Sequence, residues 1–226
     1  MMQNNYQFSK QLLHFAEQRG AKLIYASSAA VYGDAENGFR EQPACEYPLN
    51  VYGFSKLAFD NYVRARVVHS PIQAVGLRYF NVYGPQERHK GRMASVAMHL
   101  FDQLVAGQKM RLFEGSADFK RDFLHVDDAV AVNLYFLHNP QRGIFNCGSG
   151  TAQSFEDIAR NLRELHGSGE IEHIPFPADL AGKYQRFTQA DLSQLRAAGC
   201  AHSFLSLQEG LTDYYRALRG AGGYRR

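Results

Sequence analysis

Residues 22–28, KLIYASS, form a short apolar stretch that ends in two serines. A run of this length with so few charges is typical of a strand buried in a parallel sheet. Amphipathic helical patterns flank it at residues 4–19 and 50–66, and a second apolar run, IQAVGLRYF, follows at residues 72–80. Because strands and helices alternate, the sequence predicts an α/β protein with a doubly wound parallel sheet.

The second half of the chain continues with shorter predicted elements. The predicted strands cover residues 110–113, 121–126, 143–147 and 170–175. The predicted helices cover residues 94–106, 127–138, 154–166, 189–198 and 206–218. We expect these segments to extend the sheet and to add a smaller α/β unit.

Composition limits the class of protein. The chain has 226 residues, of which 45% are hydrophobic and 21% are charged, as in ordinary globular proteins. A formal net charge of +3 gives no reason to expect nucleic acid as a partner. No apolar run reaches the roughly 18 residues that a membrane helix needs, and the polar start does not resemble a signal peptide. We therefore expect a cytoplasmic protein with no membrane partner.

The spacing of cysteine and histidine gives no sign of a disulfide framework or a metal centre. Cys45, Cys147 and Cys200 lie far apart and no CxxC occurs, which favours a reducing compartment. The nine histidines show neither HExxH nor another paired spacing. No metal site is therefore predicted.

Small, polar or glycine-containing segments follow three of the predicted strands. They are Ser27-Ser28, residues 81–85 (NVYGP) and residues 148–150 (GSG). In doubly wound sheets ligands bind beyond the carboxyl ends of the strands. The sequence therefore predicts a binding site where these segments meet.

Tyr52 and Lys56 are four residues apart at the start of a predicted helix, so both side chains share one face. A free tyrosine is a weak base at neutral pH, and a neighbouring ammonium stabilises its phenolate. Ser27 or Ser28, at the end of the preceding strand, could bind the same substrate hydroxyl. An isolated Tyr-x-x-x-Lys pair is common by chance, but this context favours a catalytic pair.

Several longer stretches carry a family resemblance. They are YASSAAVYG (25–33), PLNVYGFSK (48–56), RYFNVYGP (78–85), HKGRMASVA (89–97), LFEGS (112–116), FKRDF (119–123), IPFP (174–177), YQ (184–185) and TQADL (188–192). On these stretches the chain resembles the extended short-chain dehydrogenases/reductases of the nucleotide-sugar epimerase group, from residue 1 to about residue 218. Within that group it is similar to the ADP-glyceromanno-heptose 6-epimerases, chiefly through the HKG and FEGS segments.

The resemblance implies a Rossmann-like fold and an NADP-dependent epimerisation of ADP-heptose that supplies heptose for the lipopolysaccharide core. C6 is oxidised to a ketone, the intermediate turns, and the hydride returns to the other face. Tyr52 matches one acid/base residue and Lys90 matches the second, on the opposite face of the sugar. A lysine partly withdrawn from water can serve in this way, whereas without the family pattern a solvated loop lysine would be the simpler interpretation. The resemblance also implies a homo-oligomer.

The remaining implied roles concern binding. The residues that match cofactor-binding positions are Asn4, Lys56, Val82 and Lys90. The residues that match substrate-binding positions are Asn81, Arg92, His99, Phe113, Glu114, Gly115, Ser116, Arg121 and Tyr184. The planar guanidinium of Arg121 suits pyrophosphate oxygens, although an ion pair with Asp118 or Asp122 is the simpler alternative. Arg92 departs from the family pattern, which has a small serine at this position.

The resemblance further implies a division of the chain into two domains. Residues 1–80 and 121–150 would belong to an NADP-binding Rossmann domain, and residues 81–120 and 151–226 mainly to a substrate-binding domain. The first strands and the glycine-rich loop of the fold are missing, since GSG at 148–150 has neither the spacing nor the following helix of a dinucleotide loop. At roughly 30 residues for each βαβ unit, we expect an N-terminal truncation of about 90 residues.

Two alternatives remain open. One is another nucleotide-sugar epimerase or a dehydratase, although Ala29 and Ala30 stand where dehydratases of this group carry an acidic pair. The other is a catalytically impaired fragment that has lost cofactor binding, in which case the chain alone would bind NADP poorly.

Overall fold

Three parallel strands form the first sheet of the protein. The computed structural model describes residues 1–177 and 185–224. Strands β1 (Leu23–Ser28), β2 (Ala74–Tyr79) and β6 (Gly143–Cys147) lie in the order β1-β2-β6. Leu23 pairs with Ala74, and Val75 pairs with Gly143. The α/β fold with parallel strands that the sequence predicts is confirmed.

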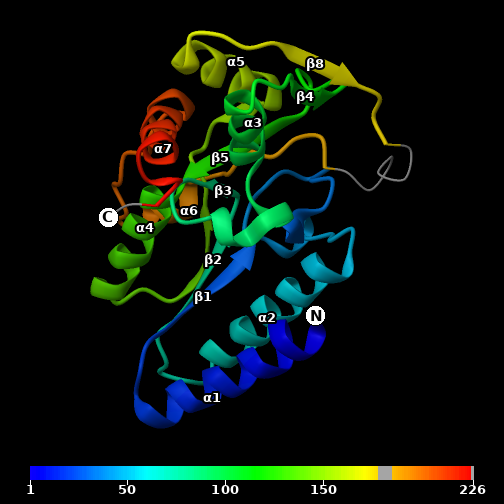
Figure 1. Ribbon diagram of the computed structural model, residues 1–226. Helices are drawn as coiled ribbons and strands as arrows, with labels where there is room; N and C mark the ends of the chain where they lie inside the picture. Colours follow the sequence, from blue (N-terminus) through cyan, green and yellow to red (C-terminus); the bar gives the residue numbers. More distant parts are fainter. Residues whose placement is uncertain (178–184, 225–226) are drawn as a thin grey trace.

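Helices cover both faces of this sheet (Figure 1). Helices α1 (Ser9–Arg19), which follows a π-helical turn at Gln3–Phe8, and α2 (Val51–Val67) pack on one face. Helices α4 (Val126–His138) and α6 (Ser193–Ala197) pack on the other. The two cores separate because successive side chains of a strand point to opposite faces: Ala74 joins the α1–α2 core, and Val75 joins the α4–α6 core.

A second sheet lies at the ends of the first. Strand β3 (Asn81–Tyr83) is parallel to β5 (Lys120–His125), and β5 is antiparallel to β7 (Ala152–Ser154). A third, two-stranded parallel sheet joins β4 (Met110–Phe113) to β8 (Ile171–Ile174). The short strands β3 and β7 were not predicted, because three-residue segments carry too little alternation to be recognised.

Three further helices pack around these smaller sheets: α3 (Val96–Val105), α5 (Phe155–His166) and α7 (Leu207–Ala221). Their apolar faces meet in one core that contains Phe101, Leu162 and Tyr214. Capping boxes at Ser154 and Ser206 fix where α5 and α7 begin. The helix predicted at 154–166 and capped by Ser154 is therefore confirmed.

The helix predicted at residues 189–198 is wrong for its first part, since α6 begins only at Ser193. Residues 187–190 run extended beside β5, where Thr188 N donates to Lys120 O and Ala190 N donates to Asp122 Oδ2. These long-range hydrogen bonds outweigh the local helical preference of the segment.

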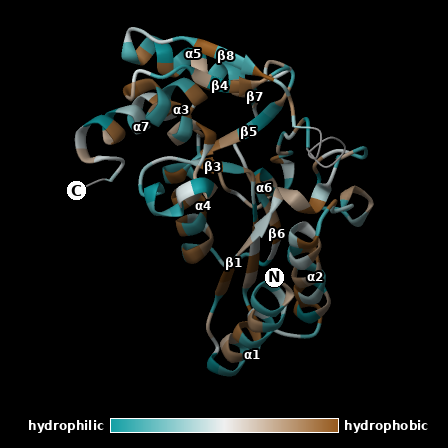
Figure 2. Cartoon of the chain, turned by 45° about the vertical axis from the view of Figure 1, so that its right-hand side comes forward, coloured by the Kyte–Doolittle hydropathy of each residue, from teal (hydrophilic) through white to brown (hydrophobic). Residues whose placement is uncertain are grey.

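The hydropathy of successive residues is mixed along α1, where brown and teal segments alternate (Figure 2). Leu12 and Phe15 of this helix, and Phe8 of the turn before it, are between two fifths and three fifths exposed. Among residues 1–177 and 185–224, no helix is both long and apolar enough to cross a membrane.

Candidate active site

The first two turns of α2 carry Tyr52 and Lys56. Asn50 caps the helix, because its side chain accepts a hydrogen bond from Gly53 N at 2.9 Å. A Cβ at Gly53 would lie 2.5 Å from Ala30 O, so only glycine lets the start of α2 pack this closely on the turn Ala29–Tyr32 that follows β1. This contact brings the helix next to Ser28, the last residue of the strand.

Tyr52 and Lys56 lie on one face of the helix, as their spacing predicts. The Lys56 Nζ atom is 5.9 Å from the centre of the Tyr52 ring, and Tyr52 is 39% exposed. Lys56 Nζ donates to Ala26 O at 2.9 Å, which holds the ammonium beside β1. Burial lowers the pKa of Lys56, and the charge of Asp60 opposes that shift.

The two serines at the end of β1 have different surroundings. Ser27 is 3% exposed, and its hydroxyl donates to Asp60 Oδ2 at 2.9 Å. Ser28 is half-buried, and its Oγ accepts from Ala30 N at 3.2 Å at the start of the turn Ala29–Tyr32. Ser27 is therefore part of the interior, whereas Ser28 lies at the strand end, near the start of α2.

A buried charge network beneath α2 was not predicted. Arg78 is fully buried; it donates from Nε to Asp60 Oδ2 at 2.9 Å and from one terminal nitrogen to Glu46 Oε1 at 2.6 Å. Its guanidinium stacks over the Tyr32 ring at 4.9 Å. A long cation in the apolar strand 72–80 was the available signal, because a buried arginine needs carboxylate partners. The network joins α2 to β1 and β2 and so fixes the helix that carries Tyr52.

Two adjoining cavities lie beyond the strand ends. The first encloses about 330 Å³, and the second encloses about 320 Å³. They share Val96 and Phe155. The first is lined by Asn81, Val82, Tyr83, Ala94, Ser95, Val96, Ala97, Arg121, Phe123, Phe155, Ile158, Leu207 and Leu211. The second is lined by Val96, His99, Leu100, Gln103, Arg111, Leu112, Phe113, Ser116, Phe119, Phe155 and Ile174.

Six of the residues named by the resemblance line these cavities. Asn81, Val82 and Arg121 line the first, and His99, Phe113 and Ser116 line the second. They come from segments up to 40 residues apart in the chain, from Asn81 to Arg121. The fold thus brings predicted binding residues that are distant in the sequence together around two adjoining cavities.

Arg121 and Asn81 are held in the wall of the first cavity. Arg121 is 5% exposed; one of its terminal nitrogens donates to Lys120 O at 3.1 Å, and its guanidinium lies 5.7 Å from the centre of the Phe155 ring. Asn81 Nδ2 donates to Asp122 O at 3.2 Å and to Thr188 Oγ1 at 3.3 Å. A planar cationic side chain in a cavity wall suits recognition of phosphate oxygens.

The second cavity has an ordered polar edge. Ser116 Oγ donates to Glu156 Oε2 at 3.0 Å, and the same oxygen lies 2.9 Å from His173 Nε2. Burial opposes ionisation of Glu156, but hydrogen bonds from His173 and Ser116 outweigh it and lower the pKa of that carboxyl. Glu114 and Gly115 lie exposed in the turn after β4, where Gly115 has a φ of 81°.

The remaining candidate residues lie elsewhere. Lys90 and Arg92 are exposed in the 3-10 segment Arg88–Met93, and Asn4 is exposed in the π-helical turn. Among the described residues, these three do not line either cavity, and neither do Tyr52 and Lys56. Tyr184 lies outside the described residues. The division into two domains stays a prediction. Helix α6 lies in the range assigned mainly to the substrate-binding domain, and it packs on β6 of the first sheet.

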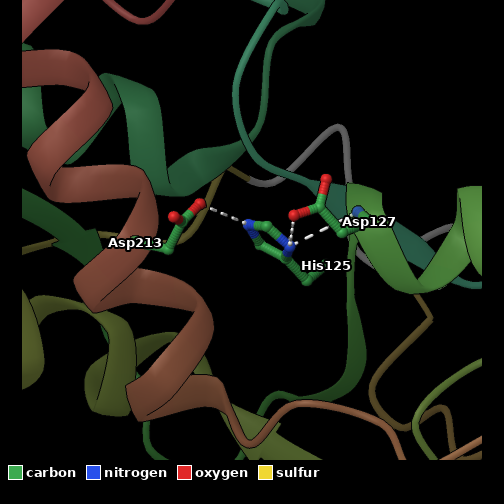
Figure 3. Close-up of side chains that lie close together, drawn as sticks. All are labelled: His125, Asp127 and Asp213. Carbon is green, nitrogen blue, oxygen red and sulfur yellow. Dashed lines mark hydrogen bonds and ion pairs between the residues drawn. The ribbon is translucent and has the colours of Figure 1, made fainter. Parts of the chain in front are cut away.

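His125 forms a polar cluster that the sequence did not reveal (Figure 3). Asp127 Oδ2 is 3.7 Å from its Nδ1, and Asp213 Oδ2 of α7 is 3.4 Å from its Nε2. The two carboxylates face different ring nitrogens, and the Asp127 backbone N–H donates to Nδ1 at 3.4 Å, so Nδ1 is the accepting nitrogen and Nε2 faces Asp213. One metal ion could take only one of these nitrogens. Asp127 is close in sequence, but only the fold brings Asp213 to this histidine.

Comparison with known proteins places the chain among sugar-nucleotide enzymes. Residues 1–148 match the NAD dependent epimerase/dehydratase family. The ADP-L-glycero-D-manno-heptose-6-epimerase of Brachyspira hyodysenteriae is 55% identical over 227 aligned positions, which cover 99% of this chain and 71% of that protein.

Solved structures agree with this assignment. The ADP-L-glycero-D-manno-heptose-6-epimerase of Helicobacter pylori superposes with a TM-score of 0.86 at 34% identity, over 97% of this chain and 67% of that chain. The UDP-glucose 4-epimerase of Thermotoga maritima gives a TM-score of 0.83 at 26% identity, over 96% of this chain and 70% of that chain. The chain therefore belongs to the NAD dependent epimerase/dehydratase family.

Proposed function

We propose that the chain carries the catalytic and sugar-binding residues of an ADP-L-glycero-D-manno-heptose 6-epimerase. The observation that carries this proposal is the pair of adjoining cavities, which are lined by six residues to which the resemblance assigns binding roles. The 55% identity to the Brachyspira enzyme supports the choice of ADP-heptose over other nucleotide sugars. Arg121 would bind the pyrophosphate, and the apolar walls around Phe113 and Phe155 would receive the flat or apolar parts of the ligand.

Tyr52 is the proposed acid/base residue on one face of the sugar. Its phenolate oxygen would take the proton of the C6 hydroxyl as the ketone forms. Lys56 would stabilise the phenolate, since its ammonium lies 5.9 Å from the ring. Ser28 would hold the same hydroxyl, because Ser27 already donates to Asp60. After the intermediate turns, the Lys90 ammonium would give a proton to the C6 oxygen on the opposite face as the ketone is reduced, and proton exchange with water would restore Tyr52 and Lys90.

The proposed cofactor is NADP, which supplies the hydride acceptor and donor when bound. Lys56 fits such a group: its half-buried side chain reaches from α2 to β1, and its ammonium has donors beyond the one that Ala26 O accepts. Lys56 would bind the ribose hydroxyls beside the nicotinamide, and Asn4 and Val82 would lie at the edge of the same site. Titration of the chain with NADPH and with NADH measures the preference, and tighter binding of NADH would overturn the choice of NADP.

The direct test uses the purified chain with ADP-D-glycero-D-manno-heptose and NADP. We expect NMR of the sugar to detect the C6 epimer without net formation of NADPH. Loss of water from the sugar would instead indicate a dehydratase, and net NADPH would indicate a dehydrogenase. Binding of ADP-heptose without turnover and without NADP binding would identify the impaired fragment.

We further propose that the product supplies heptose for the lipopolysaccharide core, in the cytoplasm, and that the protein is a homo-oligomer. Light scattering of the purified chain tests the last point, since a mass of 25.5 kDa would identify a monomer.

A further inference from the structure

Glu87 is a buried carboxylate just after the turn at Gly84-Pro85. It is 3% exposed, and its two oxygens accept hydrogen bonds from Ser95 N at 2.9 Å and from Ser95 Oγ at 2.5 Å. The hydroxyl of Tyr214, in α7, donates to the same carboxylate at 3.0 Å. A carboxylate with several donors in the interior is fixed in position, because moving it would break all of these bonds.

Lys90 reaches back to this fixed carboxylate. Its Nζ atom is 3.5 Å from Glu87 Oε2, and its backbone N–H donates to Glu87 O at 2.9 Å. The Lys90 side chain is 42% exposed, so the ammonium lies at the surface while its partner lies inside. Of the described residues, Lys90 is the cation that pairs with Glu87.

The segment that carries Lys90 is held from the other side by the end of α7. Gln86 N donates to Gly223 O at 2.8 Å, and Arg88 Nε donates to Gly222 O at 2.7 Å. Arg88 also forms an ion pair with Asp102 of α3 at 3.0 Å. The backbone around Lys90 is therefore anchored to two helices.

Ser95 connects this arrangement to the binding site. It caps α3, since its Oγ accepts from Met98 N, and it lines the first cavity together with its neighbours Ala94 and Val96. The carboxylate that contacts the Lys90 ammonium is thus bound to the wall of the cavity that contains Arg121.

We propose that Glu87 is a positioning residue that holds the Lys90 ammonium beside the carboxylate that binds Ser95, a wall residue of the first cavity. The proposal rests on the proposed function for the use of Lys90 in catalysis, but the placement itself is a property of the chain. Glu87 would act through Lys90 and would not touch the substrate. The Glu87 carboxylate is charged, buried and hydrogen-bonded to Ser95 and Tyr214, so its position is fixed and it sets the position of the Lys90 ammonium.

The placement is tested by the reactivity of Lys90 toward an acylating reagent, read by peptide mass spectrometry. Glu87→Gln should raise labelling of Lys90 about threefold, the change that loss of a half-exposed ion pair allows. Glu17→Gln is the matched control, because it removes an ion-paired carboxylate whose partner is Arg66, outside the segment that carries Lys90, and it should leave Lys90 unchanged. Lys109, which pairs with Glu170, is the internal standard.

Glu87→Asp keeps the charge but draws the carboxylate back by one methylene, so it should raise labelling of Lys90 by less than Glu87→Gln does, and it serves as the test variant if Glu87→Gln does not fold. Equal labelling of Lys90 in wild type and in Glu87→Gln would overturn the proposal. If only Glu87→Asp folds, equal labelling in wild type and in that variant would overturn it. This readout does not depend on turnover by the chain.

Turnover then separates this proposal from the proposed function. Glu87→Gln should lower kcat about tenfold with little change in KM, since misplacing an acid/base group affects the chemical step. In a Lys90→Met background, Glu87→Gln should cause no further loss, because its effect passes through Lys90. Full turnover by Lys90→Met would refute the role of Lys90, and an equal loss in both backgrounds would refute the link between Glu87 and Lys90.

Discussion

Tyr52 is the residue on which the proposed chemistry depends. It is 39% exposed at the start of α2, and its hydroxyl is not needed to bury the helix. We expect Tyr52→Phe to reduce epimerisation by about a hundredfold or more, because an acid/base group of this kind contributes that much to the rate. The measurement is epimer formation by NMR, with circular dichroism as a check of folding.

Tyr47→Phe is the matched control for Tyr52. Tyr47 is 65% exposed a few residues before α2, and the proposed mechanism gives it no part. It should retain wild-type turnover. Similar turnover in both variants would contradict the assigned role of Tyr52.

Glu46 makes the stability of the protein depend on pH. Burial opposes ionisation of this carboxyl, but hydrogen bonds and charges of Arg64 and Arg78 outweigh burial and lower the pKa of Glu46 below its usual value of 4.5. The unfolded chain therefore binds this proton at a higher pH than the folded chain does. The stabilisation is present above the unfolded pKa and is lost as the pH falls through the folded pKa.

We expect the free energy of unfolding in urea to fall as the pH drops from about 5 to about 3, and to fall less in Glu46→Gln. Part of the slope should remain in that variant, since Glu17 and Glu156 also have lowered pKa values. An identical pH slope in wild type and Glu46→Gln would show that Glu46 does not contribute.

At the scale of elements, α6 is short, but its side chains help to form the core on one face of the first sheet. Leu195 is fully buried among Val75, Leu77 and Phe145 of the first sheet. Leu195→Ala should lower the free energy of unfolding by about 2–5 kcal/mol, because it removes buried methyl groups and leaves a cavity. Urea denaturation measures the change.

The comparison for α6 is Leu134→Ala on the outer face of α4. Leu134 is 48% exposed, so its truncation should change stability by about 0.5 kcal/mol or less. Equal losses in the two variants would show that α6 does not pack on the sheet as described.

At the scale of the whole molecule, Asp122 connects the first sheet to the second. This residue of β5 is fully buried, and its carboxylate accepts from Ser149 N at 2.6 Å, Ser149 Oγ at 2.7 Å, Gly150 N at 2.9 Å and Ala190 N at 2.9 Å. These donors follow β6 and precede α6, so one side chain joins three segments. Burial raises the pKa of Asp122, and these hydrogen bonds oppose the shift.

Asp122→Asn should destabilise the protein by about 2–4 kcal/mol, because an amide nitrogen would face donors that need an acceptor. The exposed Asp118, just before the same strand, supplies the control: Asp118→Asn should have little effect. Unfolding in urea followed by fluorescence of the tyrosines compares the two. A loss below about 1 kcal/mol for Asp122→Asn would contradict the role of Asp122 as a connection.

The sequence predicted local structure well where one side chain or a repeating pattern decides it. Strands 110–113 and 143–147 were predicted with the bounds that the structure has, and Ser154 was predicted as a cap. The family match and the 55% identical relative also confirm the family resemblance. The resemblance could be recognised from the sequence because motifs such as PLNVYGFSK are continuous in the chain. Hydrophobic periodicity and caps depend on neighbours three or four residues apart, and these are visible in the sequence.

The sequence therefore determined the α/β class, most of the helices and strands, and the Tyr52–Lys56 pair. Only the tertiary structure decided that Ser27 turns inward to Asp60, that Arg78 is buried between carboxylates, and that Glu87 connects Lys90 to Ser95 and Tyr214. Tyr214 is 127 residues from Glu87, and no local pattern relates them. The physical reason is that a buried charge is stable only beside partners of opposite charge or hydrogen-bond donors. Which residues lie beside it depends on the packing of the whole chain.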